Sequence, residues 1–183
     1  TIFDKLGMKK TYFSPRANEN VADFYWNYEK DGIKPLEKLV PYVYCDGYES
    51  GGAGLVSTVE DYAKFALAMA NDGKGENGAQ ILKPETIKDI YSPVLASISV
   101  NNGFTCVQGK DYGYGLGVRT RIIETEWGLP KGEFGWDGAA GSYLMVDPVN
   151  KVTVVVGMHI RNWTPIFSGE HLKIVELIYK HIL

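Results

Sequence analysis

The sequence predicts an α+β domain in which helices come first, an antiparallel sheet follows and a helix closes the chain. Residues 57–91 carry apolar side chains at the spacing of helices, whereas residues 112–160 contain short strand-like runs separated by turns. Residues 165–183 return to the helical spacing. Because the turns in the middle section are short, we expect its strands to form an antiparallel meander.

The clearest predicted helix follows a loop of small residues at 51–54. Ser57, with Glu60 three residues later, has the pattern of a capping box, and an apolar helical face begins at Val59. The sequence Asn-Asp-Gly at 71–73 predicts the end of this helix, because glycine readily adopts the left-handed conformation. For the loop at 51–54 we favour a tightly packed turn over a ligand site.

A second, shorter helix is predicted to begin at Pro84 and to stop at Pro93, since proline suits a first helical turn but not a helix interior. Its inward residues are expected to be Ile87, Ile90 and Tyr91. A polar loop through 101–103 should lead to the sheet.

The strands are expected within residues 112–123, 132–139, 141–148 and 151–160, with a turn at 147–150. The closing helix should cover this sheet. Its expected apolar face consists of Ile166, Leu172, Val175, Leu177, Ile178 and Ile182.

The first 48 residues are expected to form irregular structure packed on a larger body, because their aromatic side chains are interrupted by turn signals. The chain also opens as though a helix or turn were already in progress. We therefore expect that it is cut from something longer.

Composition excludes several classes of function. Nineteen Lys and Arg oppose 22 Asp and Glu, giving a net charge of -3 without a basic stripe, so a nucleic-acid partner is not expected. No apolar run approaches the roughly 20 residues that span a bilayer. Cys45 and Cys106 lack the spacing of a metal site, and two ordinary thiols are favoured over a disulfide. We expect neither a metal nor a cofactor.

Several short motifs are better explained by structure than by chemistry. The glycine-rich run at 113–117 lacks the spacing of a dinucleotide-binding turn and is expected to allow close packing. A Y-x-N pattern at 25–27 is interpreted as part of the aromatic packing. His159, His171 and His181 are the only histidines, and each is interpreted as structural.

Five stretches, taken together and in order, resemble the C-terminal half of the serine β-lactamase-like hydrolases. This family includes class C β-lactamases, penicillin-binding D-alanyl peptidases and related esterases. The resemblance implies a partial β-lactamase/transpeptidase-like fold. The stretches are residues 2–13, 50–73, 81–87, 112–118 and 134–156.

The resemblance also implies a mechanism. The family uses the serine of an S-x-x-K motif as nucleophile, with the lysine and a Y-x-N tyrosine transferring protons, and a K-T-G-like triad on a strand beside the substrate. That triad aligns with Trp136, Asp137 and Gly138, which would bind substrate. The backbone N–H of Ala139 would then be one oxyanion donor. The alternative is a β-bulge whose glycine serves only the twist of the strand.

Two departures limit what is carried over. No S-x-x-K occurs in the sequence, so residues 1–183 are interpreted as a C-terminal part whose N-terminal half, with the nucleophile, is missing. Such a chain should be inactive alone. Trp136 replaces the family's lysine and supplies no cation for a β-lactam carboxylate, while Asp137 adds negative charge. Esters or peptides are therefore favoured as substrates over lactams.

The expected partners are a small ester, peptide or lactam substrate, the missing half of the same domain, and a second copy associating through an exposed sheet edge. The sequence does not give the compartment; the family that it resembles is bacterial, and its members often act outside the cytoplasm or at the cell envelope. The alternative hypothesis is a non-catalytic binding or interaction domain that kept the scaffold of this family without its chemistry.

Overall fold

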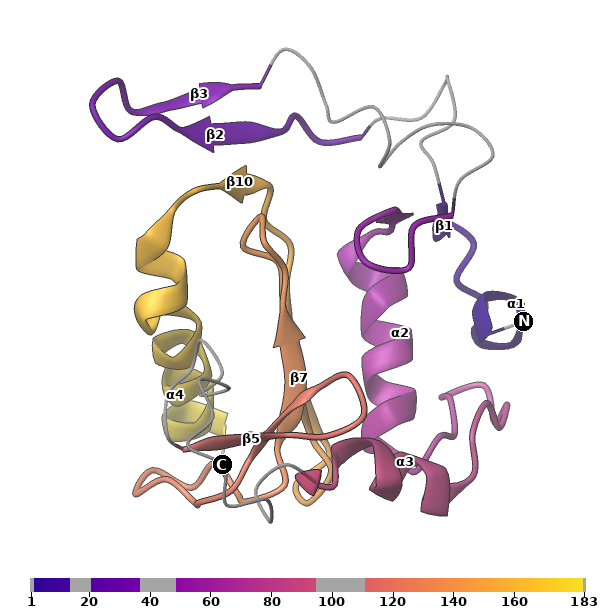
Figure 1. Cartoon of the computed structure of the whole chain (residues 1–183). Coiled ribbons are helices and arrows are strands. Elements are labelled where there is room, and N and C mark those ends of the chain that lie inside the picture. The colour runs from indigo at the N-terminus through magenta and orange to yellow at the C-terminus, as the bar shows by residue number, and fades with distance from the viewer. Residues whose placement is uncertain (1, 14–20, 37–48, 95–110, 183) are drawn as a thin grey trace.

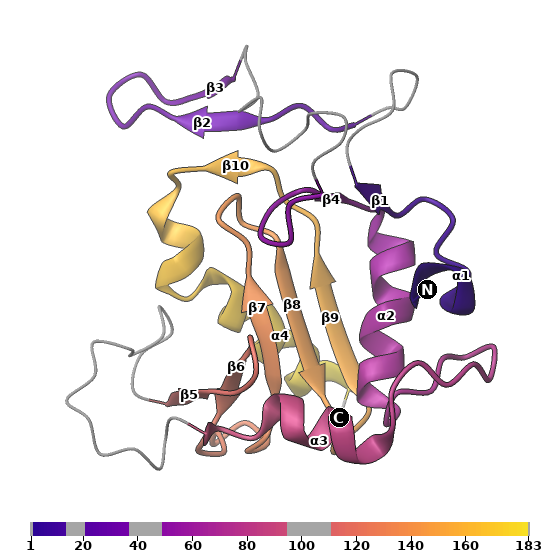
Figure 2. The ribbon, with the colours of Figure 1, turned by 45° about the vertical axis from the view of Figure 1, so that its right-hand side comes forward.

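The main sheet, seen nearly edge-on in Figure 1 and with its strands labelled in Figure 2, is a five-stranded antiparallel meander with the order β5-β6-β7-β8-β9. The computed structural model describes residues 2–13, 21–36, 49–94 and 111–182. Cys45, Cys106 and the polar loop predicted at 101–103 lie outside them. The α+β class and the meander are confirmed. The strands are β5 (Tyr112–Tyr114), β6 (Arg119–Arg121), β7 (Phe134–Asp137), β8 (Tyr143–Asp147) and β9 (Val152–Val156).

Helices cover both faces of this sheet (Figure 2). Successive strand residues point to opposite faces, so each strand contributes to two cores. On one face the sheet packs against α4 (Glu170–Ile182) through Tyr143, Met145 and Val175. On the other it packs against α2 (Val59–Ala70) and α3 (Pro84–Tyr91), where Phe134 and Val146 are buried. The candidate strand β7 thus lies between two helical layers.

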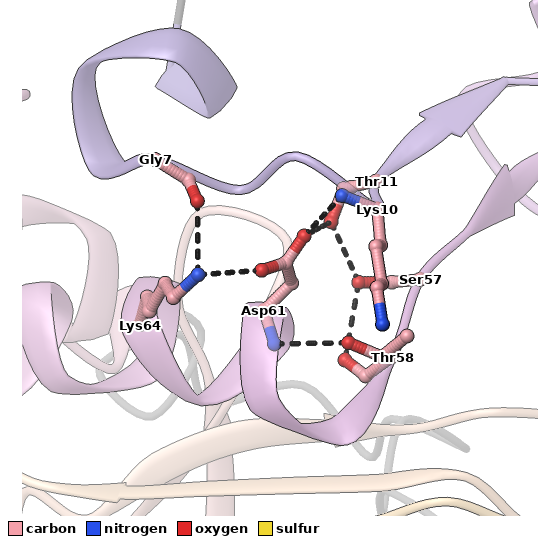
Figure 3. Close-up of polar contacts among 7 residues, drawn as sticks. All are labelled: Gly7, Lys10, Thr11, Ser57, Thr58, Asp61 and Lys64. Carbon is pink, nitrogen blue, oxygen red and sulfur yellow. Dashed lines mark hydrogen bonds and ion pairs between the residues drawn. The ribbon is translucent and has the colours of Figure 1, made fainter.

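Helix α2 begins one residue later than the predicted capping box implies. Thr58 is the N-cap, and its Oγ1 accepts a hydrogen bond from Asp61 N at 3.2 Å. Ser57 instead makes a 2.8 Å hydrogen bond with Thr11 (Figure 3). Both residues carry the hydroxyl that an N-cap needs, so the prediction that Ser57 caps the helix is wrong by one position.

The Asp61 carboxylate attaches the N-terminal segment to α2 (Figure 3). It accepts hydrogen bonds from Lys10 N at 2.6 Å, Thr11 Oγ1 at 3.2 Å and Lys64 Nζ at 2.6 Å. Lys64 also donates to the carbonyl of Gly7 at 2.9 Å. This buried carboxylate is therefore bound both by the distant segment at 10–11 and by Lys64 of its own helix.

The helix ends follow the sequence. Helix α2 ends at Ala70, and Gly73 follows with φ +83°. This is the left-handed conformation on which the predicted helix end at 71–73 is based. Helix α3 begins at Pro84 and buries Ile87. Gly115 lies so close to the carbonyl oxygen of Ile90 that a β-carbon would overlap it, which confirms close packing for the glycine-rich run.

The closing segment is a 3-10 turn, η2 (Thr164–Ser168), followed by α4. Val175 is buried as expected, but Leu177 is 59% exposed, so its assignment to the apolar face is wrong. Steps of three and four residues from Val175 reach Ile178 and Tyr179, which pack inward, whereas Leu177 falls on the opposite side.

The N-terminal region is more regular than expected. Helix α1 (Ile2–Leu6) packs on α2, and β1 (Tyr12–Phe13) pairs with β4 (Leu55–Val56). A small sheet lies beyond the end of the main one (Figures 1 and 2). It joins β2 (Tyr25–Asn27), β3 (Ile33–Pro35) and β10 (Ile160–Arg161), which places the Y-x-N pattern on a paired strand. None of the described helices is long and apolar enough to cross a bilayer.

Candidate functional site

Strand β7 is paired unequally on its two sides. It pairs with β8 over all four residues from Phe134 to Asp137, but with β6 only through Phe134 and Gly135. Trp136 and Asp137 therefore have no partner on the β6 side among the described strands. A strand edge left open in this way can accept an extended chain or substrate.

Among the described residues, the turn after β7 leaves more than one amide without an acceptor, including those of Ala139 and Ala140. Gly138 N donates to Ser142 O at 2.7 Å, and Gly141 N donates to Gly138 O at 2.8 Å. Ile160 N holds the carbonyl of Ala140 at 2.9 Å. Ala139 is exposed, and its N–H finds no acceptor within the described part of the chain. An exposed, unpaired N–H on a fixed turn is what an oxyanion donor requires.

The small size of Gly138 follows from the turn itself. A β-carbon at this position would lie 3.2 Å from Ser142 Cβ, tighter than most such contacts. Ser142 is held in turn, because its Oγ donates to Met158 O at 3.1 Å. The glycine thus has a structural reason that is independent of any substrate.

Trp136 and Asp137 lie on opposite faces of the sheet. Trp136 is 47% exposed on the α2 and α3 side, and its ring meets Tyr114 edge to face at 5.5 Å. Asp137 lies opposite Tyr143 on the α4 side. Of the two neighbours, Trp136 offers the accessible surface, while the Asp137 carboxylate turns toward the interior.

A buried network of charges receives that carboxylate. Arg119 Nε lies 3.3 Å from Asp137 Oδ2, and Arg119 Nη1 lies 3.3 Å from Glu133 Oε1. His171 Nδ1 lies 3.2 Å from Asp137 Oδ1. The negative charge expected to repel anionic ligands is therefore paired inside the protein with a guanidinium.

Burial and neighbouring charges set the protonation of this network. Burial lowers the pKa of Arg119, but the negative charges around it, Glu133 foremost, outweigh burial and raise this pKa above its ordinary value. The guanidinium therefore stays charged. Burial raises the pKa of Glu133, although Arg119 and Arg121 oppose it. Burial also raises the pKa of Tyr112, whose phenol therefore remains neutral.

Gly135 makes room for the network. A β-carbon there would overlap the carbonyl oxygen of Leu144 and lie 2.8 Å from Arg119 Nη1. The Arg119 guanidinium also lies 4.7 Å from the centre of the Tyr143 ring, an attractive cation–π contact. The absence of a side chain at Gly135 thus lets the arginine cross the strand.

The four residues predicted for the site, Trp136 to Ala139, form one continuous segment, but sequence reasoning missed the network beneath it. Arg119 and Arg121 alternate in a short run that Val118 and Ile122 flank, a pattern that calls for buried carboxylates close by. His171 was interpreted only as structural, and no local signal identifies its partner.

A surface cavity lies away from the candidate strand. It has a volume of about 460 Å³, is lined by Arg121, Trp127 and Lys173 among others, and shares no residue with the Trp136–Ala139 segment. Within the described ranges, no group of three or more His, Cys, Asp or Glu is arranged to hold a metal ion.

The chain belongs to the β-lactamase family, whose model, described as Beta-lactamase, matches residues 1–176. It is similar to Protein Rv1367c of Mycobacterium tuberculosis (strain ATCC 25618 / H37Rv), with 28% identity over 157 residues. The match covers 80% of this chain and 38% of that protein. The family resemblance is therefore confirmed.

Two solved structures share the fold. EstCE1, described as a hydrolase with promiscuous acyltransferase activity, matches with a TM-score of 0.75 at 21% identity, covering 97% of this chain and 48% of its own. Unliganded simvastatin synthase (LovD) from Aspergillus terreus, a selenomethionyl derivative, matches with a TM-score of 0.77 at 20% identity, covering 99% and 48%. The chain thus spans about half of each, which confirms a partial β-lactamase/transpeptidase-like fold.

Proposed function

We propose that this chain supplies the substrate-side strand and one oxyanion donor of a serine acyl-transferring hydrolase of the esterase, D-amino-peptidase or carboxypeptidase kind. One observation carries the proposal: the unpaired Ala139 N–H at the end of a strand with an open edge. The family membership and the hydrolase and acyltransferase description of EstCE1 support it.

In the proposed reaction, a serine oxygen attacks the substrate carbonyl and the carbonyl electron pair moves to its oxygen. The Ala139 N–H donates to that oxyanion, the leaving group departs with a proton, and water then hydrolyses the acyl-enzyme. The sequence contains no S-x-x-K, so the nucleophile and its own N–H, the second donor, would belong to an N-terminal half outside these residues.

The proposed substrates are esters or peptides with an apolar acyl group. Trp136 presents an accessible ring at the open edge and carries no charge to pair with a carboxylate. The Asp137 carboxylate is paired with Arg119 on the opposite face, so it does not contribute a second ligand contact there.

The experiment compares the isolated chain with the same chain extended by its upstream reading frame, using p-nitrophenyl esters and nitrocefin. The isolated chain should give no turnover, and the extended protein should hydrolyse the esters. In the extended protein, Ala139→Pro removes the N–H and should lower kcat by about 10²–10³-fold, whereas Ala139→Gly keeps the N–H and most of the activity.

Two results would overturn the proposal. Turnover by the isolated chain above a denatured-protein control would mean that the nucleophile lies within it. Full activity of the Ala139→Pro protein would remove Ala139 as an oxyanion donor.

A binding or interaction domain is the second candidate, favoured by the lack of S-x-x-K together with the open edge of β7. Such an edge could hold an extended peptide through main-chain hydrogen bonds. An upstream reading frame without S-x-x-K would favour this candidate, and the presence of that motif would favour the hydrolase.

A further inference from the structure

His171 joins helix α4 to both ends of the candidate turn. Its side chain is 99% buried, its Nδ1 lies 3.2 Å from Asp137 Oδ1, and its Nε2 lies 2.9 Å from the carbonyl oxygen of Gly141. Asp137 immediately precedes the turn and Gly141 closes it. The imidazole therefore spans the segment that carries Ala139.

The identity of these partners determines where the protons lie. A carbonyl oxygen only accepts hydrogen bonds, so Nε2 must carry a proton to bind Gly141. The Asp137 carboxylate, whose Oδ2 lies 3.3 Å from Arg119 Nε, is also a hydrogen-bond acceptor, so Nδ1 must carry a proton as well in order to bind it. The geometry thus calls for a doubly protonated imidazole.

The ionisable groups on the sheet beneath α4 are Arg119 and Arg121 from β6, Asp137 from β7, Glu133 just before β7, Tyr112 from β5 and Tyr143 from β8. The Tyr143 ring stacks on the imidazole with centroids 4.4 Å apart. Asp137 is the carboxylate in direct contact, so the cation and its counter-ion are neighbours.

We propose that His171 is a positioning residue that, by donating from both ring nitrogens, holds the turn at 138–141 and so places the Ala139 N–H. The catalytic consequence rests on the proposed function. Loss of one imidazole proton removes one of the two bonds, because a bare nitrogen facing an oxygen is repulsive. The turn should then loosen while α4 remains packed on the sheet.

The first test uses the unmodified chain and nitrogen-15 NMR. In the state with both contacts formed, each ring nitrogen of His171 should carry a proton, and the amide signals of Gly138, Ala139 and Gly141 should shift when the ring loses one. His181 is the internal control, because it is exposed on the same helix and bonds only the carbonyl of Leu177, at 2.7 Å. A bare ring nitrogen with unchanged turn signals would overturn the inference.

The second test compares three substitutions. His171→Phe keeps a ring for stacking on Tyr143 but loses both bonds, and should raise the hydrogen-exchange rates of the Gly138 and Gly141 amides about tenfold. His171→Gln places a donor near the Nε2 position and should restore much of the protection. His181→Phe should leave both rates unchanged.

Equal exchange rates in all three variants would contradict the inference. If His171→Phe fails to fold, the titration of the unmodified chain still decides the question.

The activity assay separates the two proposals. In the extended protein, His171→Phe should lower kcat more than it changes KM, since substrate contacts remain at Trp136. If the NMR results appear as expected but no ester is hydrolysed, the proposed function fails and the positioning role stands. If esters are hydrolysed but the turn signals ignore His171, the positioning role fails.

Discussion

Tyr179 donates its hydroxyl hydrogen bond to Asp147, a fully buried carboxylate, and so joins α4 to the hairpin between β8 and β9. The same carboxylate accepts from Val149 N at 2.7 Å, Asn150 N at 3.0 Å and Asn150 Nδ2 at 2.7 Å. One aspartate therefore shapes the predicted turn at 147–150 and also connects it to the closing helix.

Tyr179→Phe removes only the bond between the helix and this carboxylate. The free energy of unfolding should fall by about 2 kcal/mol, as expected for a hydrogen bond to a buried charge. Urea unfolding followed by circular dichroism measures it. Tyr28→Phe is the matched control, because Tyr28 is 42% exposed and should change stability little. Equal losses in both variants would contradict this role for Tyr179.

Asp61 should make the fold sensitive to acid. Burial raises the pKa of Asp61, but hydrogen bonds from Lys64 and Lys10 outweigh it and lower the pKa below the ordinary 3.8. A depressed pKa means that the stabilisation is present above pH 3.8 and is lost as pH falls through the folded value.

Asp61→Asn should therefore destabilise the chain by about 1.5–3 kcal/mol near neutral pH and flatten its stability profile in acid. The measurement is the free energy of unfolding at a series of pH values. Asp31→Asn, at an exposed turn position, should keep the profile of the unmodified chain. An unchanged acid slope in the Asp61→Asn chain would refute the assignment.

Gly135→Ala should be among the most damaging single-methyl changes in the sheet. The added β-carbon overlaps the Leu144 carbonyl and crowds Arg119, so the loss should be about 3 kcal/mol or more. Gly51→Ala is the control, because Gly51 has open space around it and no left-handed conformation. Thermal unfolding of both variants compares them, and similar midpoints would count against the overlap.

Trp136→Lys should change substrate choice more than stability. In the extended protein it should lower kcat/KM for apolar p-nitrophenyl esters by roughly tenfold and improve hydrolysis of nitrocefin, whose carboxylate gains a cation. Unfolding free energy should change by less than about 1.5 kcal/mol, since mainly the contact with Tyr114 is lost. Trp136→Phe should keep the ester preference. Unchanged selectivity with lysine would exclude Trp136 from the substrate site.

Self-association of the chain is expected if its open edge and exposed apolar side chains are normally covered by another half. Leu116 is 63% exposed near the same end of the sheet as Tyr114 and Trp136. Sedimentation velocity over a range of concentrations should show reversible oligomers. A single monomeric species at every concentration would argue against the half-domain proposal.

Local periodicity accounts for what the sequence predicted well. The alternation of inward and outward side chains in β7 and β8 and the helical spacing around Ile87 involve residues close together in sequence. They can therefore be predicted without knowledge of the tertiary structure. The choice between Ser57 and Thr58 as N-cap was not readable, because it depends on Thr11, which is 46 positions from Ser57. Tertiary contacts decided that boundary.

The candidate site also has a part that the sequence predicts and a part that depends on tertiary contacts. The consecutive residues Trp136 to Ala139 were located by resemblance, and alternation along β7 already places Asp137 on the face of Glu133. His171 could not be matched to Asp137 from sequence, because 34 residues separate them and α4 had no known docking direction. Buried ion pairs between distant elements leave no local periodic signature.

The division of β7 into two faces has a consequence for engineering. Asp137 anchors the interior, whereas its neighbour Trp136 projects into open space from the same short strand. A saturation library at Trp136 should therefore retain a large fraction of folded members, while one at Asp137 should not. Position 136 should therefore tolerate substitutions that change the exposed surface, whereas the adjacent position 137 should not.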